Sequence, residues 1–367
     1  MTDLRTEEYD INMGPHHPST HGVCRLLLTM DGERVVKVEP HIGYLHRAIE
    51  KICENRTYAM CIPILDRFEY VTAMSCNYVF SLASERLAGI EVPERAEYLR
   101  VIMLELNRIA SHLIFFGTTA MDIGALTPFL YALREREDIM DLFEMTCGQR
   151  LTYNYIRVGG VSQDIPAEFT PRCKKTIANI TEKVEEYKRL LNGNPIWKMR
   201  TIGIGKLDAD LALAYGASGP ILRASGVDYD LRRDDPYSIY DRFDFKIPVY
   251  QNGDVYDRYM ARLDEIQESC KIVAQALEGI EEGPIRAKVS PNFKPPAGET
   301  YTRIENSRGE MGVYLVSDGT KKPTRVKARG GSYPHLQLLP QITKGCLIAD
   351  LVAIFASFDV ILPEVDR

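Results

Sequence analysis

The 367-residue sequence predicts an α+β fold in which a central helical bundle lies between small β elements near the two ends of the chain. Apolar residues recur at helical spacing through the middle of the sequence, whereas Asp-Gly pairs flanked by apolar runs occur near both ends. The hydrophobic share of 45% and the charged share of 26% are those of an ordinary globular protein. The length is sufficient for one large core or two modest ones.

Turn chemistry predicts the β elements. Residues 22–39 are expected to form two strands joined at Asp31-Gly32, because Asp-Gly readily takes the positive φ angles of a two-residue hairpin turn. Residues 313–327 repeat this arrangement around Asp318-Gly319. Each end of the chain is therefore expected to contribute a β-hairpin.

Hydrophobic periodicity predicts the helical core. One helix, whose start Pro93 favours, carries an apolar stripe. The stripe consists of Leu99, Ile102, Met103, Leu106, Ile109, Ala110 and Leu113. A further amphipathic helix is expected from about Asp254 to Gly279. One face of each helix is expected to be buried.

Two Thr-Pro pairs predict the start of two more helices. Thr127-Pro128 and Thr170-Pro171 each place a capping hydroxyl before a proline, which is favoured at the first helical position. The second of these helices is expected to end at Gly193.

Composition argues against several classes of function. The net charge of −6 and the lack of Lys/Arg clusters interleaved with aromatics argue against a nucleic-acid partner. The apolar run at residues 351–358 is far shorter than the ~20 residues needed to cross a bilayer. The polar first residues predict no secretory leader, and the segment Gly203-Ile204-Gly205-Lys206 lacks the remaining residues of a dinucleotide loop or a P-loop.

The cysteines indicate that the chain alone binds no metal or iron-sulfur cluster. They are scattered without a C-x-x-C pair, so no segment has the cysteine spacing of a zinc ribbon or of an iron-sulfur cluster site. Free thiols in a reducing cytoplasm are expected. Their positions are Cys24, Cys53, Cys61, Cys76, Cys147, Cys173, Cys270 and Cys346.

The densest chemistry lies in the histidine-rich loop at residues 14–22. Its prolines and glycines cannot sustain a helix, so the loop is expected to be stiff. Three interpretations are open: a metal site formed by His17, His21 and Cys24, a turn capped by satisfied histidines, or an imidazole that donates a proton near neutral pH.

Two further candidates lie in apolar surroundings. Tyr70 closes the segment Asp-Arg-Phe-Glu-Tyr, where a phenol is more often a core residue with a bonded hydroxyl than a proton donor. Asp122 is a lone carboxylate among small and apolar residues between two predicted helices. Burial of such a group is unfavourable without a partner, and a histidine is the expected one.

The last residues resemble a metal motif without its ligands. Asp359 begins a segment in which Ile361 and Glu364 stand where a D-P-C-x-x-C-x-x-H motif would have its thiolates. A nickel or iron centre needs such sulfur ligands. The pattern therefore suggests a metalloenzyme scaffold without its metal.

Taken in order, the motifs of the chain resemble the D-type subunit, or 49-kilodalton-type subunit, of respiratory complex I, and the resemblance covers nearly the whole sequence. The motifs are GPHHPSTHG, PHIGYLHRAIEK, ENRTY, LDRFEY, AMDIGALTPF, YIRVGGVSQD, LRASGVDYDLR, PYSIYDRFDF, GDVYDRYMARLDEI, GEMGVYLVSDG and the terminal EVDR. This family is similar to the large subunit of nickel-iron hydrogenases, so the resemblance implies that fold and a quinone headgroup in the vacated metal cavity.

The resemblance also implies a set of site residues. His21 and Tyr70 would each donate a proton to one quinone oxygen, and Asp122 would orient His21 and stabilise its imidazolium. The quinone pocket would also be lined by His17, Thr118 and Phe129.

Electrons are expected from a 4Fe-4S cluster on the neighbouring B-type subunit. The resemblance places Arg47 and Thr152 near this cluster, although a salt bridge at a helix start is an alternative for Arg47. Many family members carry a histidine in place of Thr152, which makes the cluster potential high and pH-dependent. With threonine, a low potential suited to menaquinone or a methanophenazine-like carrier is expected.

The resemblance implies a peripheral subunit of a proton-translocating oxidoreductase on the cytoplasmic face of the membrane. The expected partners are the B-, C-, I- and H-type subunits and the membrane arm, and the donor is NADH, ferredoxin or reduced F420. An active hydrogenase large subunit and a structural scaffold with an inert cavity are the alternatives.

Three regions of the chain are expected. The first is an N-terminal α+β region with the quinone-site loop at 1–90. The second is a helical core at 91–285 with an α+β insertion near 195–252, and the third is a C-terminal hairpin and helix at 286–367.

Overall fold

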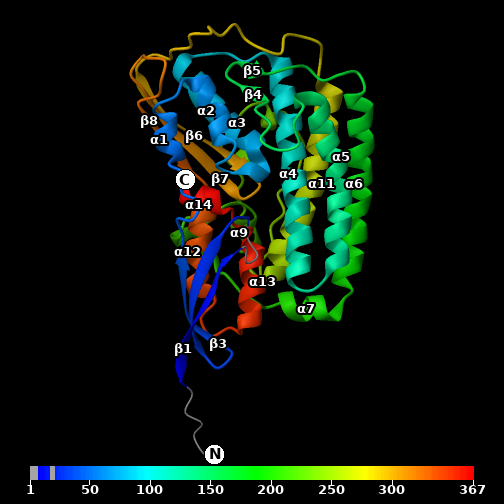
Figure 1. Cartoon of the computed structure of the whole chain (residues 1–367). Helices are drawn as coiled ribbons and strands as arrows, with labels where there is room; N and C mark the ends of the chain where they lie inside the picture. Colours follow the sequence, from blue (N-terminus) through cyan, green and yellow to red (C-terminus); the bar gives the residue numbers. More distant parts are fainter. Residues whose placement is uncertain (1–6, 17–20) are drawn as a thin grey trace, which may run out of the picture.

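The computed structural model describes residues 7–16 and 21–367. Long helices pack side by side on one side of the molecule, and small sheets with shorter helices lie on the other (Figure 1). The predicted α+β fold with a helical core and small terminal sheets is confirmed, and it is consistent with the hydrogenase-like fold that the resemblance implies. No helix in the described part of the chain is long and apolar enough to cross a membrane.

Four long helices form the bundle, in which α4 packs against α5 and α11, and α6 packs against the same two helices (Figure 1). Their bounds are α4 Glu94–Asp122, α5 Leu126–Cys147, α6 Phe169–Asn192 and α11 Val255–Gly279. The apolar stripe predicted for α4 is fully buried. Asp254 caps α11 by accepting a hydrogen bond from the amide of Asp257 at 2.9 Å.

The predicted capping role of Thr127 and Thr170 is wrong. Helices α5 and α6 begin one residue before each threonine, and neither N-cap residue makes a side-chain hydrogen bond. Each proline is therefore the third residue of its helix. This position tolerates proline because the first amides of a helix have no intrahelical acceptor. The predicted end of α6 is confirmed, since Gly193 is its C-cap.

Two three-stranded antiparallel sheets contain the predicted strand pairs, which are confirmed as β2–β3 and β7–β8. The two-residue turn predicted at Asp318-Gly319 is wrong, because the longer loop 318–324 joins β7 to β8. The N-terminal sheet consists of β1 Glu8–His16, β2 Cys24–Asp31 and β3 Arg34–His41. The C-terminal sheet consists of β6 Gly298–Asn306, β7 Gly309–Ser317 and β8 Arg325–Arg329. Strands β1 and β6 add an unpredicted edge to each hairpin. A short pair, β4 Ile156–Arg157 and β5 Gly160–Val161, follows the bundle helix α5.

Shorter helices cover the two sheets. The C-terminal sheet packs against α1 and α3, and the N-terminal sheet packs against α12. The helices between the N-terminal sheet and the bundle helix α4 are α1 Ile49–Cys53, α2 Tyr58–Leu65, the 3-10 helix η1 Tyr70–Thr72 and α3 Ala73–Ala88. Those near the C-terminus are α12 Ser332–Ile342, α13 Ile348–Phe358 and α14 Leu362–Asp366.

The segment between α6 and α11, for which the sequence predicts an α+β insertion, contains short helices and no strand. They are α7 Pro195–Thr201, α8 Ala209–Ala214, α9 Gly219–Ala224, α10 Leu231–Asp234 and the 3-10 helix η2 Tyr240–Arg242. The division of the chain into three regions stays a prediction. The larger hydrophobic core contains residues from all three.

The turn between β6 and β7 lies inside the protein rather than at its surface. Its residues Asn306, Ser307 and Arg308 are at most 2% exposed. Gly309 ends the turn with a φ of +102°, and a Cβ added there would lie 2.4 Å from the Ser218 hydroxyl oxygen. Only glycine allows the turn to approach α9 this closely.

Replacing Gly309 with alanine is therefore expected to lower the free energy of unfolding by about 2 kcal/mol or more, through backbone strain and the clash with Ser218. Gly319→Ala is the matched control, because Gly319 also has a positive φ, of +86°, but an added Cβ there would lie 3.9 Å from the nearest atom, the amide nitrogen of Ala297. Denaturant titration of both variants measures the difference. Equal losses would show that the close approach to α9 contributes nothing.

Candidate functional site

His21 joins the start of the N-terminal sheet to the C-terminal tail. Its amide donates to the carbonyl of Val360 at 3.1 Å, and its carbonyl accepts from the amide of Leu362 at 2.9 Å. These two bonds form a parallel bridge between His21 and Ile361. The tail therefore fixes the backbone of His21 from both sides.

The imidazole of His21 points at a carboxylate of the same tail. Its Nε2 lies 3.3 Å from Oδ1 of Asp359, and the two side chains are 17% and 2% exposed. Asp359 is the C-cap of α13 and has a φ of 54°, a left-handed conformation that aspartate tolerates better than most residues. The end of α13 thus supplies the carboxylate that contacts His21.

Arg308, from the buried β6–β7 turn, holds this carboxylate in place. Its Nη2 donates to Oδ1 of Asp359 at 2.9 Å, and its Nε donates to the Asp359 carbonyl at 2.8 Å. Its Nη1 donates to Oε1 of Glu69 at 3.1 Å. Glu69 is also the N-cap of η1, where it accepts a hydrogen bond from the amide of Thr72. Tyr70, the first residue of η1, therefore directly follows a member of this ion pair in the chain. His21 and Tyr70 are thereby attached to one charge cluster.

Burial and charge set the protonation of this cluster. Burial opposes ionisation of Asp359, but Arg308 and His21 hold its pKa well below the ordinary carboxyl value. Burial raises the pKa of Glu69 to about 7, although Arg308 opposes this. Burial also raises the pKa of Tyr70 above that of a free phenol, so its hydroxyl keeps its proton at neutral pH. The site combines an ionised carboxylate facing an imidazole with a neutral phenol.

The remaining predicted catalytic and pocket residues fall into a second group, at the turn between α4 and α5. Asp122 is the last residue of α4, and Thr118 lies one helical turn before it. A Cβ on Gly117 would lie 3.1 Å from the Cα of Phe129, so α4 and α5 approach closely beside Thr118. The predicted contact between Asp122 and His21 stays a prediction, and His17 lies outside the described residues.

Thr152 lies in a different place, a polar hollow of about 520 Å³ between α2 and the β4–β5 pair. Two arginines, Arg67 and Arg157, line this hollow together with Thr152. Arg47 is exposed, and its amide contacts the carbonyl of Arg367 at 3.4 Å. Thr152 and Arg47 are therefore held by different parts of the fold, and the structure does not bring them together in this hollow.

Several observations bear on a metal site. Burial raises the pKa of the Cys24 thiol to about 11, which disfavours the thiolate that a metal would need. Ile361 and Glu364, at the positions of the two missing thiolates, are buried, and Glu364 accepts a hydrogen bond from the amide of Ser332 at 3.2 Å. Among the described residues, no group of three or more His, Cys, Asp and Glu side chains could hold a metal ion.

Sequence reasoning missed three members of the site. Glu69 stands beside Tyr70 in the same motif, and Asp359 opens the tail segment, so both lay in segments already identified by their chemistry. No sequence feature indicated that Arg308 belongs to the site, because an arginine in a turn is ordinarily expected at the surface. Its role follows only from the packing of β6 and β7 into the core.

The fold is consistent with that of a hydrogenase-type large subunit, and a buried charge cluster lies beside the tail positions where metal ligands would be expected. The family model of the respiratory-chain NADH dehydrogenase 49 Kd subunit matches residues 122–291 and 287–367. The D-type subunit of NADH-quinone oxidoreductase from Clostridium beijerinckii is 52% identical over 365 residues, covering 100% of this chain and 99% of the relative. The corresponding subunit from Dehalococcoides mccartyi is 53% identical, with 99% and 100% covered. The chain belongs to the family of the 49-kilodalton, or D-type, subunit of complex I.

Proposed function

We propose that this chain forms, with a B-type partner subunit, the site at which a quinone or a methanophenazine-like carrier is reduced. The assembly would be a proton-translocating oxidoreductase, with the chain bound peripherally at the cytoplasmic face through the B-, C-, I- and H-type subunits and the membrane arm. The observation that carries the proposal is that His21 contacts Asp359, while the charges of Arg308, Glu69 and Asp359 in the same buried cluster act on Tyr70. Family membership supports the reaction class, because the relatives are NADH-quinone oxidoreductases.

Two proton donors match what a quinone requires when it takes up two electrons. Each of its two oxygens must gain a proton, and one donor per oxygen is sufficient. Tyr70, whose raised pKa keeps its proton in place, would serve one oxygen. The imidazolium of His21 would serve the other. Thr118, Phe129 and His17 would line the path of the ring, from the α4–α5 turn to this cluster.

Asp359 would orient His21 and stabilise its imidazolium. A carboxylate bonded to an imidazole fixes its tautomer and favours its charged form. Asp359 is suited to this role because Arg308 keeps it ionised and in place. Asp122 is the alternative carboxylate, from the α4 side of the site.

The electrons would come from a 4Fe-4S cluster held by the partner subunit. Thr152 lines a hollow together with Arg67 and Arg157, and with threonine in place of a histidine we expect a low cluster potential. Because threonine exchanges no proton near neutral pH, we expect a cluster potential that does not depend on pH. A donor other than NADH, such as reduced F420, is compatible with the same site.

An inert scaffold and an active hydrogenase large subunit are the alternatives. The scaffold would tolerate substitution at His21 and Tyr70. The hydrogenase would require nickel and cysteine ligands, for which the described residues offer no group.

Tyr70→Phe tests the proposal. The change removes one hydroxyl and little volume, and electron transfer from the native donor to a quinone analogue is expected to fall by about 10²-fold or more, the ordinary contribution of a positioned proton donor. Transfer to a ferricyanide-type acceptor, which draws from upstream centres, is expected to stay unchanged and shows that the enzyme is assembled.

Tyr314→Phe is the matched control, because the Tyr314 hydroxyl faces outward and bonds Glu299 at 2.6 Å. It should leave both rates unchanged. If Tyr70→Phe also leaves quinone reduction at the unmodified level, the cluster is not the site and the scaffold alternative is favoured.

A further inference from the structure

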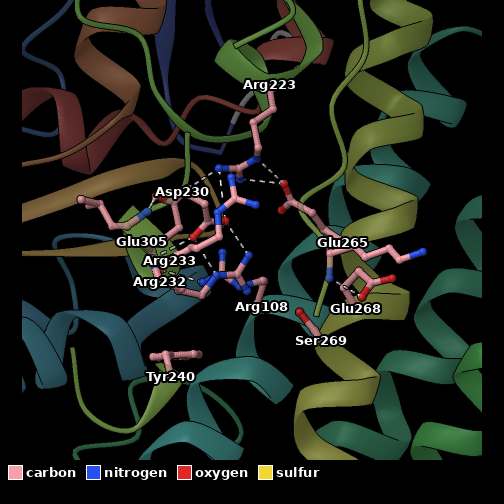
Figure 2. A network of polar contacts seen from close by, with 12 residues as sticks. Arg108, Arg223, Asp230, Arg232, Arg233, Tyr240, Glu265, Glu268, Ser269 and Glu305 are labelled. Atoms are coloured by element: carbon pink, nitrogen blue, oxygen red, sulfur yellow. Dashed lines mark hydrogen bonds and ion pairs between the residues drawn. The ribbon is translucent and has the colours of Figure 1, made fainter. Parts of the chain in front are cut away.

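A second buried charge cluster, which the proposed reaction does not use, lies between α4, α11 and the end of β6 (Figure 2). We call it the arginine cluster. Each of its side chains is at most 4% exposed. Its members are Glu105 and Arg108 of α4, Arg223 of α9, Asp230 and Arg232 at α10, Glu265 of α11 and Glu305 of β6.

Arg223 lies at the centre of this cluster and contacts three carboxylates. Its Nη2 is 2.6 Å from Oε1 of Glu265, and its Nη1 is 2.8 Å from Oε1 of Glu305. The same Nη1 lies 3.4 Å from Oδ2 of Asp230. In Figure 2 the guanidinium of Arg223 lies between Glu265 and Glu305. Arg223 therefore cannot neutralise all three acids.

The side chains of the arginine cluster that contact one another include more acids than bases. Among the described residues they are three arginines and four carboxylates. A histidine, His112, is also in contact, with its Nε2 2.9 Å from Oε2 of Glu265. Burial lowers the pKa of His112 to about 4, so it is neutral at pH 7. A fourth buried arginine, Arg262, acts on Glu265 from outside these contacts. The carboxylate with the fewest donors is therefore the one that a bound proton stabilises most.

Glu305 is the carboxylate that the contacts select for this proton. Glu105 accepts from two arginines, Tyr240 and Ser269, and its pKa is lowered despite its burial. The charges of Arg232 and Arg223 hold the pKa of Asp230 at about 2 against the effect of burial.

Glu265 is likewise held ionised by Arg223 and His112 against the effect of burial. Glu305 accepts only from Arg223 and, at 3.3 Å, from the amide of Leu231. The charged groups that act on it are Arg108 of α4, Arg223 of α9, and Asp230 and Arg232 at α10. Burial and, next, the charge of Asp230 raise its pKa to about 7, although these arginines act in the opposite direction.

The buried β6–β7 turn connects this proton site to the candidate functional site. Glu305 lies in the arginine cluster, and the next residue, Asn306, donates from Nδ2 to Oε2 of Glu69 at 3.1 Å. Ser307 shares a hydrogen bond with Ser111 of α4 at 3.0 Å. Arg308 then holds Asp359, the partner of His21. Four successive buried side chains thus extend from one cluster to the other.

We propose that Glu305 is a proton-binding site of the chain and that the buried turn couples its protonation to the charge of His21. The coupling, but not the proton site itself, rests on the proposed function. When His21 gives its proton to the carrier, a positive charge beside Asp359 is lost and the potential along the turn becomes more negative. Glu305 then takes up one proton from solvent. For each proton that passes from His21 to the carrier, one O–H bond forms at Glu305. When His21 is protonated again from solvent, this O–H bond breaks and its proton returns to solvent.

Glu305→Gln in the intact enzyme tests the proton site, because glutamine keeps the shape and cannot ionise. Infrared spectra recorded over a pH series without turnover should contain a carboxylic-acid absorption that grows as the pH falls through about 7. We expect the part of this absorption that belongs to Glu305 to be lost in Glu305→Gln and kept in Glu299→Gln, an exposed glutamate of the same sheet, while the contribution of Glu69 stays in both variants. An unchanged absorption in Glu305→Gln would overturn the proposal. Reduction of the ferricyanide-type acceptor by both variants shows that the enzyme is assembled.

The pH profile of quinone reduction tests the coupling. Above about pH 7 the ionised Glu305 favours the protonated form of His21, and glutamine removes this effect. The alkaline limb of the profile should therefore move to lower pH in Glu305→Gln and stay in place in Glu299→Gln. An unshifted limb would overturn the coupling. Failure of the proposed function is distinguishable, because the infrared absorption needs no quinone.

Discussion

Replacing Arg308 with methionine is expected to lower the free energy of unfolding by about 3–5 kcal/mol, the ordinary effect of breaking a buried ion pair. The reason is that the change leaves Asp359 and Glu69 buried without the cation that both contact. Total stabilities of single domains are about 5–15 kcal/mol, so the loss is a large fraction of the whole. Arg308 is thus expected to be among the residues on which the fold depends most.

Denaturant titration followed by the fluorescence of Trp197, the only tryptophan and a buried one, measures this effect. Arg325→Met is the matched control. Arg325 pairs with Glu54 at 2.9 Å but is 49% exposed, and surface pairs contribute little. If the two variants unfold at the same denaturant concentration, the Arg308 cluster does not stabilise the fold.

Replacing Asp359 with asparagine is expected to slow quinone reduction by about 10²–10⁴-fold, while transfer to the ferricyanide-type acceptor continues. A neutral amide no longer favours the imidazolium of His21 and can hold the wrong tautomer, which is the effect known for a carboxylate behind a catalytic histidine. The expected loss is in the maximal rate, because Asp359 would act on the proton transfer rather than on binding of the carrier.

Asp122→Asn, measured in parallel, separates the two candidate carboxylates. Asp359 contacts His21 in the structure, whereas Asp122 lies at the end of α4. A larger loss with Asp359→Asn assigns the orienting role to Asp359. A loss confined to Asp122→Asn would show instead that His21 leaves Asp359 in the working enzyme and that Asp122 has the role the resemblance implies.

Local signals in the sequence were sufficient for most of the fold. The stripe of α4, the helix from about Asp254 to Gly279 and the hairpin at Asp31-Gly32 depend on neighbouring residues, and all three are present in the structure. Strands β1 and β6 were missed because their turns lack the Asp-Gly signal. The β6–β7 turn is Ser307-Arg308-Gly309, whose conformation depends on close packing against α9 rather than on its own residues.

The site was predictable only in part, for a related reason. The resemblance selects His21 and Tyr70 by their motifs, and the structure attaches both to one cluster. Their connection through Asp359 and Arg308 depends on contacts between segments far apart in the chain, and residue spacing carries no information about such distances. The charge balance of the arginine cluster is hidden in the same way, because its members come from four separate helices and one strand.

The closure of the tail on the N-terminal region has a consequence for the order of folding. The amide of Gly43 donates to Oδ1 of Asp366 at 2.7 Å across a separation of 323 residues, and His21 pairs with Ile361 in the same region. Closing so long a loop reduces chain entropy before any contact is gained, so such contacts form late. A nascent or partly folded chain would therefore form its helical bundle before its candidate site. The site would be complete only when both ends of the chain have reached their native positions.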